Sequence, residues 1–312
     1  MTVSQASQAD TYNYTTIDNP NQTGGTVGFG INNSGQISGY YFTGAQRQTI
    51  NSFVYDGSTY TTINDPNALA GTTVASDINN NGILVGDFQD STGPHGFLYN
   101  GSTYTTLNYP NATGSGGTIP ISINDTGEVA GIFYTGNNNV GNGFLYNGST
   151  YTTLNDPNST KGTYAYGINN SGDVVGYFDN GNVGNGFLYN GSTYTTLIDP
   201  NATNGTYALG INNNGEVVGY YTDSTGNHAF VYNGSTYTTL NYPNTTPNNP
   251  TLDTYAFGIN DSGKVTGYFV NNHGVSLIGF VATPATVPVP TSVWLFGSAL
   301  AGFIGFNRRK TA

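Results

Sequence analysis

The chain has few of the residue types on which most catalytic and metal sites depend. Its 312 residues include no cysteine, three histidines, one tryptophan and only 7% charged side chains. Without cysteine, the chain can form neither a disulfide framework nor a thiolate metal site. The charged fraction is well below the usual quarter, so solubility must come from Asn, Thr, Ser and Gly.

Basic residues are the scarcer of the two charged classes. Six Lys and Arg stand against 17 Asp and Glu, which gives a formal net charge of −11 and an isoelectric point near 4.2. Three of the six basic residues are Arg308, Arg309 and Lys310, close to the C-terminal end. The body of the chain could not neutralise a run of phosphates, which excludes nucleic acid as a partner.

What the chain has in abundance is one repeated β-hairpin. In the copy from Gly186 to Pro200, an apolar run leads to Asn190-Gly191, two residues expected to accept positive φ in a tight turn, and a β-branched run returns. Other copies begin at Phe53, Phe97, Phe144 and Phe230. Tyr14 to Ile17 provides only a returning strand, and Gly279 to Val281 only an outgoing one. The two ends can therefore complete one unit together.

The spacing of the copies predicts the architecture. The hairpin tyrosine recurs at steps of 46, 44, 47, 43 and 43 residues, and a period of about 40 to 50 with four strands per unit is typical of propeller blades. An Asn-x-x-Gly turn occurs six times, beginning at Asn32, Asn79, Asn124, Asn169, Asn212 and Asn260. We predict an all-β fold, a six-bladed β-propeller of four-stranded antiparallel blades. The N-terminal strand Tyr12 to Ile17 closes it against Gly279 to Ala282. A β-solenoid is the structural alternative.

Residue size along the strands suggests how blades would stack. Tyr164, Tyr166 and Ile168 share one strand face, whereas Ala165 and Gly167 occupy the other. We expect the bulky face of one blade to fill the flat face of its neighbour. The recurrent second-strand glycine is expected to make room for a neighbouring blade as well; its copies are Gly39, Gly86, Gly131, Gly176, Gly219 and Gly267.

The two ends of the chain differ from the repeats. Residues 1–10 are interpreted as a disordered N-terminus or signal-peptide remnant, residues 11–282 as the propeller, and residues 283–290 as a Pro-rich linker. Residues 291–312 are interpreted as a short hydrophobic helix with a basic tail. Its apolar part would be about 24 Å long, workable as a membrane anchor with Trp294 and the basic cluster at its ends. A buried amphipathic helix is the alternative, but the run has no polar face.

Two resemblances add expectations. Gly210-Ile-Asn-Asn-Asn-Gly-Glu-Val-Val-Gly219 followed by His228-Ala229-Phe230 resembles the HAF-repeat family of extracellular bacterial repeat proteins, over about Thr11 to Ala282. The ending resembles the PEP-CTERM sorting signal, with Pro-Val-Pro in place of Pro-Glu-Pro. Its matching residues are Pro288, Val289, Pro290, Trp294, Arg308, Arg309 and Lys310. These resemblances imply export to the bacterial envelope or medium, recognition by an exosortase-type processing enzyme and transient membrane insertion. Neither implies a reaction.

The Asn-rich turns invite a calcium interpretation, because oxygen ligands at alternate positions followed by Gly are found in calcium loops. The residue after the glycine nevertheless differs in every copy, being Gln36, Ile83, Glu128, Asp173, Glu216 or Lys264. No carboxylate recurs where a bidentate ligand would be needed. We therefore predict plain hairpin turns, whose asparagines tolerate left-handed backbone, with no metal and no cofactor.

The histidines give little support to catalysis. His95 and His228 occupy equivalent places before the third strand of their copies, where Asn51, Asn142 and Asn185 stand in others. Because Asn shares the hydrogen bonding of His but not its proton transfer, a role in bracing the loop is favoured over a ligand role. No Ser-His-Asp set or paired acid can be assembled from the spacing, so we predict a protein that is not an enzyme.

One face of the expected propeller is a candidate binding surface. It would gather the linking residues Asp65, Asp156 and Asp199 with the segments around His95, Asn142, Asn185 and His228. Tyr, Asn and Asp side chains suit sugar recognition by stacking and hydrogen bonding, which makes extracellular polysaccharide a candidate partner. The leading hypothesis is a non-enzymatic structural or matrix-associated surface protein, and the alternative is a glycan-binding propeller that uses this loop face.

Overall fold

A computed structural model describes residues 12–44, 47, 49–113, 115–136, 140–240, 253–271 and 276–285. Contacts divide the chain into one unit, Tyr14–Thr283, and a second that comprises Met1–Asn13 and Pro284–Ala312. The predicted N-terminal segment 1–10, the anchor helix and all seven sorting-signal residues lie outside the described residues. Within the described part, no helix is both long and apolar enough to cross a membrane.

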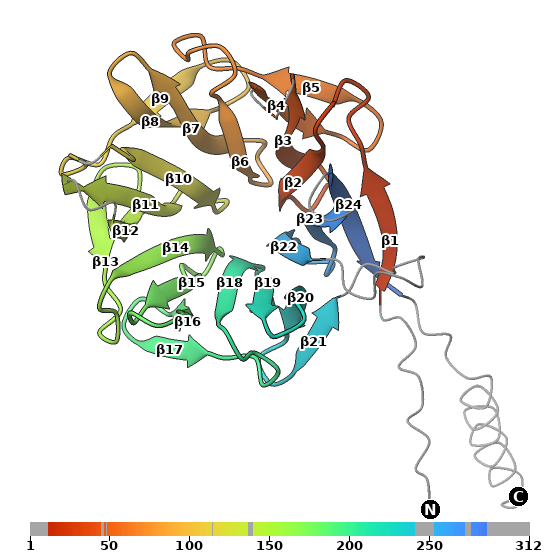
Figure 1. Ribbon diagram of the computed structural model, residues 1–312. Coiled ribbons are helices and arrows are strands. Elements are labelled where there is room, and N and C mark those ends of the chain that lie inside the picture. Colours follow the sequence, from red (N-terminus) through yellow and green to blue (C-terminus); the bar gives the residue numbers. More distant parts are fainter. Residues whose placement is uncertain are drawn as a thin grey trace, which may run out of the picture. The chain divides into compact units, whose positions relative to one another are not determined.

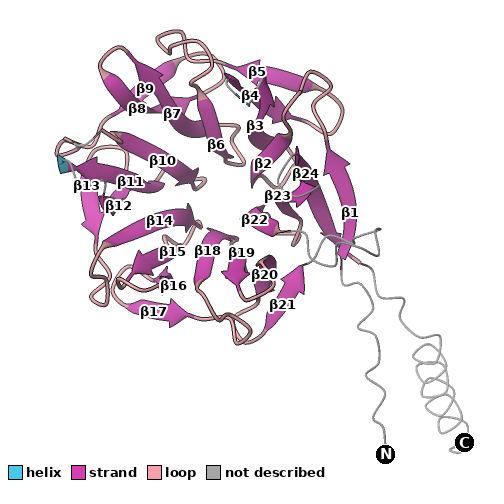
Figure 2. Cartoon of the chain, viewed as in Figure 1, coloured by secondary structure: helices cyan, strands magenta, loops and turns pink. Residues whose placement is uncertain are grey.

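The described chain is all-β, as predicted, and its strands form antiparallel four-stranded meanders (Figure 2). Three sheets follow the order of the sequence. The first contains β2 (Thr26–Ile31), β3 (Ile37–Thr43), β4 (Thr49–Tyr55) and β5 (Tyr60–Ile63). The second contains β6 (Val74–Ile78), β7 (Leu84–Asp90), β8 (Gly93–Tyr99) and β9 (Tyr104–Leu107). The third contains β18 (Thr206–Ile211), β19 (Val217–Thr222), β20 (Asn227–Tyr232) and β21 (Tyr237–Leu240).

Eight strands form one larger sheet. It contains β10 (Thr118–Ile123), β11 (Val129–Thr135), β12 (Val140–Tyr146) and β13 (Tyr151–Leu154), then β14 (Gly162–Ile168), β15 (Val174–Asp179), β16 (Gly184–Tyr189) and β17 (Tyr194–Leu197). A single parallel pair, Asn142 with Thr163, joins the first four strands to the last four. Each half is otherwise an antiparallel meander like the other sheets.

The remaining sheet joins the two ends of the repeat region. It contains β22 (Thr254–Ile259), β23 (Val265–Asn271), β24 (Ser276–Pro284) and β1 (Tyr12–Ile17), in the order β1-β24-β23-β22. The predicted neighbour relation between the first and last strands is therefore confirmed. It covers an edge of β24 that would otherwise be open to pairing with another chain.

The sheets of the unit Tyr14–Thr283 follow one another round an axis (Figure 1). The first strands of the copies, which lie nearest the axis, contact each other in the order β2, β6, β10, β14, β18 and β22, and β22 contacts β2 again. A rod-like solenoid would leave β2 and β22 apart. The unit is a β-propeller, and the solenoid alternative is wrong.

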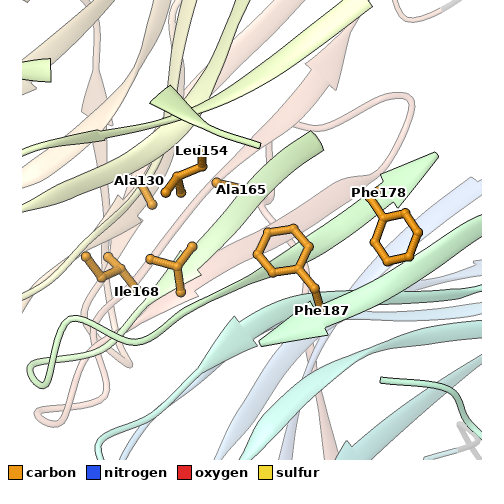
Figure 3. Packing of buried hydrophobic residues seen from close by; sticks show 7 residues of the cluster. Ala130, Leu154, Ala165, Ile168, Phe178 and Phe187 are labelled. Carbon is orange, nitrogen blue, oxygen red and sulfur yellow. The ribbon is translucent and has the colours of Figure 1, made fainter. Parts of the chain in front are cut away.

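Apolar side chains fill the space between successive meanders. In one such cluster, Ala130 and Leu154 of one meander pack with Ala165, Ile168 and Phe187 of the next (Figure 3). Gly167 is a flat position, since a Cβ on it would crowd the backbone of Gly210 in the following meander. The prediction that Ala165 and Gly167 share one face is wrong, because the strand register shifts between them and Ala165 packs with Ile168 against the preceding meander. The rings of Tyr164 and Tyr207 lie over Gly141 and Gly184 of the meanders before them. Bulky residues of one meander thus meet flat positions of its neighbour.

The second-strand glycine has another role than predicted. A Cβ on Gly176 would strike the main-chain oxygen of Tyr164 and the ring of Phe187, both in the same meander. Gly176 and Phe187 are cross-strand partners, and each copy holds a fully buried phenylalanine at that place: Phe53, Phe97, Phe144, Phe187, Phe230 and Phe280. Burying each ring stabilises the fold by about 1.5–3 kcal/mol. The glycine makes room for this ring and not for a neighbouring blade.

The Asn-Gly hairpins also differ from the prediction. Gly191 has positive φ, at 88°, but Asn190 does not, and Arg47 is the one non-glycine residue with positive φ in the described part of the chain. Instead, Asn190 Oδ1 accepts hydrogen bonds from the main-chain N–H groups of Ser192 and Thr193, at 3.1 and 2.9 Å. Asparagine is used here for its side-chain acceptor, and only the glycine supplies left-handed backbone.

Candidate functional site

Each first strand carries an irregularity that turns one residue toward the axis. The strand register shifts in all six copies, between Ala165 and Gly167 in the fourth, for example. A β-bulge of this kind redirects a side chain. The residues at the shifts are Phe29, Ser76, Ile121, Tyr166, Leu209 and Phe257, and all six line a cavity of about 90 Å³. These positions therefore contribute mostly apolar side chains to the lining of the cavity.

The six Asn-x-x-Gly turns surround the cavity with a closed circle of hydrogen bonds. The Nδ2 of each first asparagine donates to the main-chain oxygen of the equivalent asparagine in the next copy, at 2.9–3.3 Å. The last of these bonds runs from Asn260 back to Asn32. Within its own turn, Asn169 Oδ1 accepts from the N–H groups of Ser171 and Asp173. One asparagine side chain thus accepts hydrogen bonds that stabilise its own turn and donates one to the next turn.

A second circle lies beside the first and is formed by the next residue of each turn. Its main-chain N–H donates to the Oδ1 of the following copy at 2.7–2.9 Å. The members are Asn33, Asn80, Asp125, Asn170, Asn213 and Asp261. Asp125 Oδ2 also accepts from the side chains of Asn80 and Asn170, and Asp261 Oδ2 accepts from those of Asn33 and Asn213. Every member is held by its neighbours.

The carboxyl groups around the axis are of two kinds, those whose pKa is lowered and those whose pKa is raised. Burial works against the charge of Asp125 and Asp261, but the hydrogen bonds from the asparagines outweigh it and lower the pKa of both carboxyls. Asp77 is different, because burial raises its pKa to about 6 although Ser122 and Ile123 donate to its Oδ2, at 2.7 and 3.0 Å. The rim is therefore anionic at neutral pH.

The cavity is suited to water and small polar solutes. A volume of about 90 Å³ holds roughly three water molecules at the ~30 Å³ that each takes up in the liquid. Sites for drug-sized ligands are several times larger, at about 300 Å³ or more. No group of three or more His, Cys, Asp or Glu side chains within the described ranges could hold a metal ion. The two circles thus serve chiefly to tie neighbouring copies together.

His95 lies in strand β8 and His228 in strand β20, so their predicted place before the third strand is wrong, and the side chain of each braces the loop before its strand. His95 Nε2 lies 2.8 Å from Thr92 Oγ1 and 3.1 Å from Asp90 Oδ1, and its Nδ1 lies 3.0 Å from Asn108 Oδ1. His228 repeats the arrangement with Thr225 and Asp223, at 2.9 and 3.2 Å. Hydrogen bonds from the threonine hydroxyls and main chains lower the pKa of Asp90 and Asp223 to about 2. Each histidine is thus part of a loop-bracing network with an ionised carboxylate.

The asparagines at the equivalent positions also bond locally. Asn142 and Asn185 pair across the hairpin with Phe133 and Phe178, as His95 does with Phe88 and His228 with Tyr221. Their side-chain amides donate to the main-chain oxygens of Val140 and Val183, at 3.2 and 2.9 Å. The four positions predicted to be equivalent are therefore equivalent. A ligand role for them stays a prediction.

The three linking aspartates are buried, with 2%, 3% and 0% of Asp65, Asp156 and Asp199 exposed. Each accepts the N–H of the residue two positions on, at 2.8 Å, and so shapes the turn that links two copies. The other oxygen, Oδ2, of Asp156 and Asp199 has no hydrogen-bond partner. Direct contact with a ligand would require the links to move, and glycan binding by these residues stays a prediction.

Sequence reasoning missed a chain of aromatic rings near the axis. Three stacked pairs occur within copies, Tyr164 with Tyr177, Tyr207 with Tyr220, and Tyr255 with Tyr268, at centroid distances of 4.6–4.8 Å. Edge contacts of 5.0 and 4.9 Å join each pair to the next. Phe257, Phe29 and Tyr40 continue the chain at 4.4–5.7 Å. Aligning the six copies would have revealed the recurrent tyrosine.

The same alignment would have revealed two departures in the second copy. Asp77 stands where the other copies have Gly30, Ser122, Gly167, Gly210 and Gly258, and Asp87 stands where they have Tyr40, Ile132, Tyr177, Tyr220 and Tyr268. Asp77 is paired with the third copy through Ser122. Burial raises the pKa of Asp87 to about 7. The second copy thus contributes both carboxyls of raised pKa near the axis.

Melting should not depend on calcium. A bound ion at a hundredfold excess over its Kd would stabilise the fold by about 2.7 kcal/mol per site, whereas the turn oxygens here already accept hydrogen bonds from the protein. We expect melting curves recorded with excess chelator and with millimolar calcium to agree within about two degrees. A shift of about ten degrees in calcium would contradict the hydrogen-bonded account of the turns.

The comparisons with known proteins bear on the fold. Residues 2–119 match the family described as Protein of unknown function (DUF3466), and no curated protein matches the chain. A mutant of AofleA from Arthrobotrys oligospora is similar at 12% identity with a TM-score of 0.50, covering 91% of this chain and 93% of that one. A protein of unknown function from Dyadobacter fermentans is similar at 12% identity with a TM-score of 0.51, covering 87% and 99%. These likenesses concern the propeller fold alone.

Proposed function

We propose that the protein is a non-enzymatic propeller that serves as a structural or matrix-associated component of a bacterial surface. The observation that carries this proposal is the pair of hydrogen-bond circles, because they fix all six turns to one another round the axis. Such a ring has few ways to deform. It suits a rigid spacer or scaffold better than a site that closes on a substrate.

A count of six blades is part of this proposal. The eight-stranded sheet is held together by one parallel pair, Asn142 with Thr163. A bridge of the same kind joins Gly25 to Leu277, across two separate sheets. The larger sheet is therefore best regarded as two blades in ordinary contact, which with the other four sheets makes six.

The absence of catalysis is supported by the condition of the titratable groups. The side chains of both histidines are bonded to a Thr and an Asp side chain that precede them in the same hairpin. Asp125 and Asp261 accept several hydrogen bonds each and hold no proton at neutral pH. A general acid or base needs an accessible group with a pKa near the working pH, and Asp125 and Asp261 do not meet that condition. Asp77 and Asp87, whose pKa values burial raises to about 6 and about 7, are the carboxyls to substitute if any activity is found. Export and processing through the Pro288-Val289-Pro290 ending remain part of the proposal.

Carbohydrate binding is the second candidate function. It is favoured by the aromatic chain near the axis, since tyrosine rings stack on sugar faces and their hydroxyls hydrogen-bond to sugar hydroxyls. The face that contains His95 and His228 is the other candidate surface. Extracellular polysaccharide is the corresponding partner.

A polysaccharide array tests the two functions. The wild-type protein and the double variant His95→Asn, His228→Asn are applied to neutral and charged polymers. Asparagine already stands at this position in other copies, so the variant should fold. A structural role predicts no signal above background for either protein. Binding by the wild type would contradict a purely structural role, and its loss in the variant would place the sugar on the histidine face.

A further inference from the structure

The hairpins between the third and fourth strands carry the triplet Asn-Gly-Ser in four copies. Their first residues, called the tip asparagines below, are Asn100, Asn147, Asn190 and Asn233. An Asn-x-Ser or Asn-x-Thr triplet without proline in the middle is the acceptor sequence for N-linked sugars. All four tip asparagines are exposed. Because the same triplet also makes a tight turn, the question is whether the turn itself uses the amide group.

The turn uses the oxygen of the amide and not its nitrogen. Asn190 Oδ1 accepts hydrogen bonds from the Ser192 and Thr193 N–H groups and, at 3.0 Å, from the Ser192 hydroxyl, and the other three tips repeat these bonds. In the first copy Asp56 stands at this place, and its Oδ1 accepts the corresponding bonds from Ser58 and Thr59 at 2.8 Å. A carboxylate has no N–H to donate. The hairpin therefore forms without the amide nitrogen.

The amide nitrogens of the tip asparagines are free to react. No hydrogen bond in the described part of the chain involves the Nδ2 of any of the four, so both N–H groups of each face solvent. The bonds to Oδ1 hold the side chain in one orientation. An enzyme that acts on Nδ2 therefore meets an ordered group and does not have to order it at a cost in entropy.

The inner circle contains the same kind of triplet in a different condition. Asn32, Asn124, Asn169 and Asn260 each begin an Asn-x-Ser or Asn-x-Thr triplet. The hydroxyl of the triplet again donates to Oδ1, at 2.7–2.8 Å in three of the four. These asparagines are only 4% exposed, however, and the Nδ2 of each donates to the next turn. The fold thus separates similar triplets into those with a free nitrogen and those with an occupied one.

The tip asparagines lie at the outer margin of one face. Strands of a meander alternate in direction, so the connection after the third strand lies at the same end of the sheet as the Asn-x-x-Gly turn after the first. The fourth strands β9, β13, β17 and β21 lie on the outside of the ring (Figure 1). Loops after the second strands, which His95 and His228 brace, are at the opposite end. Sugars on the tips would leave the histidine face open and would add hydrated surface to a chain with 7% charged residues.

We propose that Asn100, Asn147, Asn190 and Asn233 are acceptor sites for N-linked sugars. The substrate is a sugar activated as a phosphate or diphosphate ester, and a glycosyltransferase of the producing cell catalyses the transfer. A bond forms between Nδ2 and C1 of the sugar while the bond from C1 to the phosphate oxygen breaks. The phosphate or diphosphate leaves with the electron pair, and Nδ2 loses one proton to a base of the transferase. The proposal depends on neither of the two functions given above.

Intact-mass measurements on the protein purified from the cells that make it test the assignment. A quadruple variant combines Asn100→Asp, Asn147→Asp, Asn190→Asp and Asn233→Asp. It should fold, because Asp56 already forms the same turn. The matched variant is Asp56→Asn, which gives the first copy the triplet of the other four hairpins. Comparing proteins made in the same cells cancels any trimming of the chain ends.

We expect the wild type to carry a sugar unit at each of the four tips, the quadruple variant to carry none, and Asp56→Asn to gain one more unit than the wild type. A wild-type protein without sugar would overturn the proposal. Sugar that persists in the quadruple variant would overturn the assignment to the tips and place it on other triplets, such as those that begin at Asn158 and Asn201 in the links between copies. An Asp56→Asn protein with no added unit would contradict the role of the exposed triplet.

Discussion

Removing residues 1–17 should strongly destabilise the propeller. The deletion takes away β1, which completes the sheet of β22, β23 and β24. It also removes Ile17, which is 2% exposed and packs with Ile31 and Ile37. Losing one buried isoleucine costs about 2–3 kcal/mol, and each strand hydrogen bond adds about 1 kcal/mol. The total approaches the 5–15 kcal/mol by which domains are usually stable.

Thermal unfolding and gel filtration measure this effect. We expect the truncated protein to melt more than ten degrees lower or to aggregate through the exposed edge of β24. Deleting residues 1–11 is the control, since it leaves β1 (Tyr12–Ile17) intact and should not change the transition. A circular permutant that carries residues 12–17 after residue 285 should restore it. If the 1–17 deletion melts like the full chain, the closing strand contributes little.

The second large effect is expected at the inner hydrogen-bond circle. Asn212 is 3% exposed, and its Nδ2 donates to the main-chain oxygen of Asn260 at 3.0 Å and to Glu216 Oε2 at 2.7 Å. Asn212→Asp keeps the acceptor of the turn but places a carboxylate against both of these oxygens. One buried and one partly buried hydrogen bond, at about 1–3 kcal/mol each, are lost. We expect a loss of roughly 3 kcal/mol or more in the free energy of unfolding, which lowers the melting temperature by about ten degrees.

Denaturant titration checks this value, and two further variants sharpen it. Asn190→Asp is the control, because Asp56 already occupies the equivalent hairpin position and its pKa is lowered by the hydrogen bonds from Thr59 and Ser58; its stability should be unchanged at neutral pH. Adding Glu216→Gln to Asn212→Asp should recover about 1 kcal/mol, since an amide can donate to the new carboxylate. Equal stability of Asn212→Asp and the wild type would mean that the circle does not hold the copies together.

How much of this could be read from the sequence depends on the distance between partners along the chain. Strands, hairpins and the pairing of the two ends followed from local patterns, because Gly and β-branched runs mark turns and strands within a few residues. The hydrogen bonds from each asparagine side chain to the next turn join residues that are 43–48 positions apart in the sequence. The bond that closes the circle, from Asn260 to Asn32, joins residues 228 positions apart. No local rule connects such positions. The asparagines were therefore predicted to be present for their tolerance of left-handed backbone, whereas their side chains form the hydrogen bonds that connect the turns.

The candidate site shows the same limit. His95 and His228 attracted attention as rare residue types, yet the structure gives them local partners. Asp87 was overlooked because an aspartate in a strand is unremarkable alone; its importance comes from the tyrosines at the same position in other copies. A comparison of the repeats position by position would have singled out Asp77 and Asp87. Which residues of other copies lie beside these two aspartates can be identified only from the folded structure.

The hydrogen-bond circles have a direction. Along both circles each turn donates to the next copy, through the side-chain amide of the first asparagine and the main-chain N–H of the following residue, so these contacts are head-to-tail and none is self-complementary. The side chains of Asn33 and Asn170 add bonds in the opposite direction, to Asp261 and Asp125. Head-to-tail contacts build a closed ring only when the rotation per copy divides a full turn, and an open helix otherwise. The geometry of the asparagine contacts therefore fixes the rotation between neighbouring copies, and with it the number of copies in a closed ring. A duplicated repeat would leave one donor and one acceptor of the circle without a partner unless every angle between blades narrowed. The hydrogen bonds at the axis therefore oppose the gain or loss of a single copy.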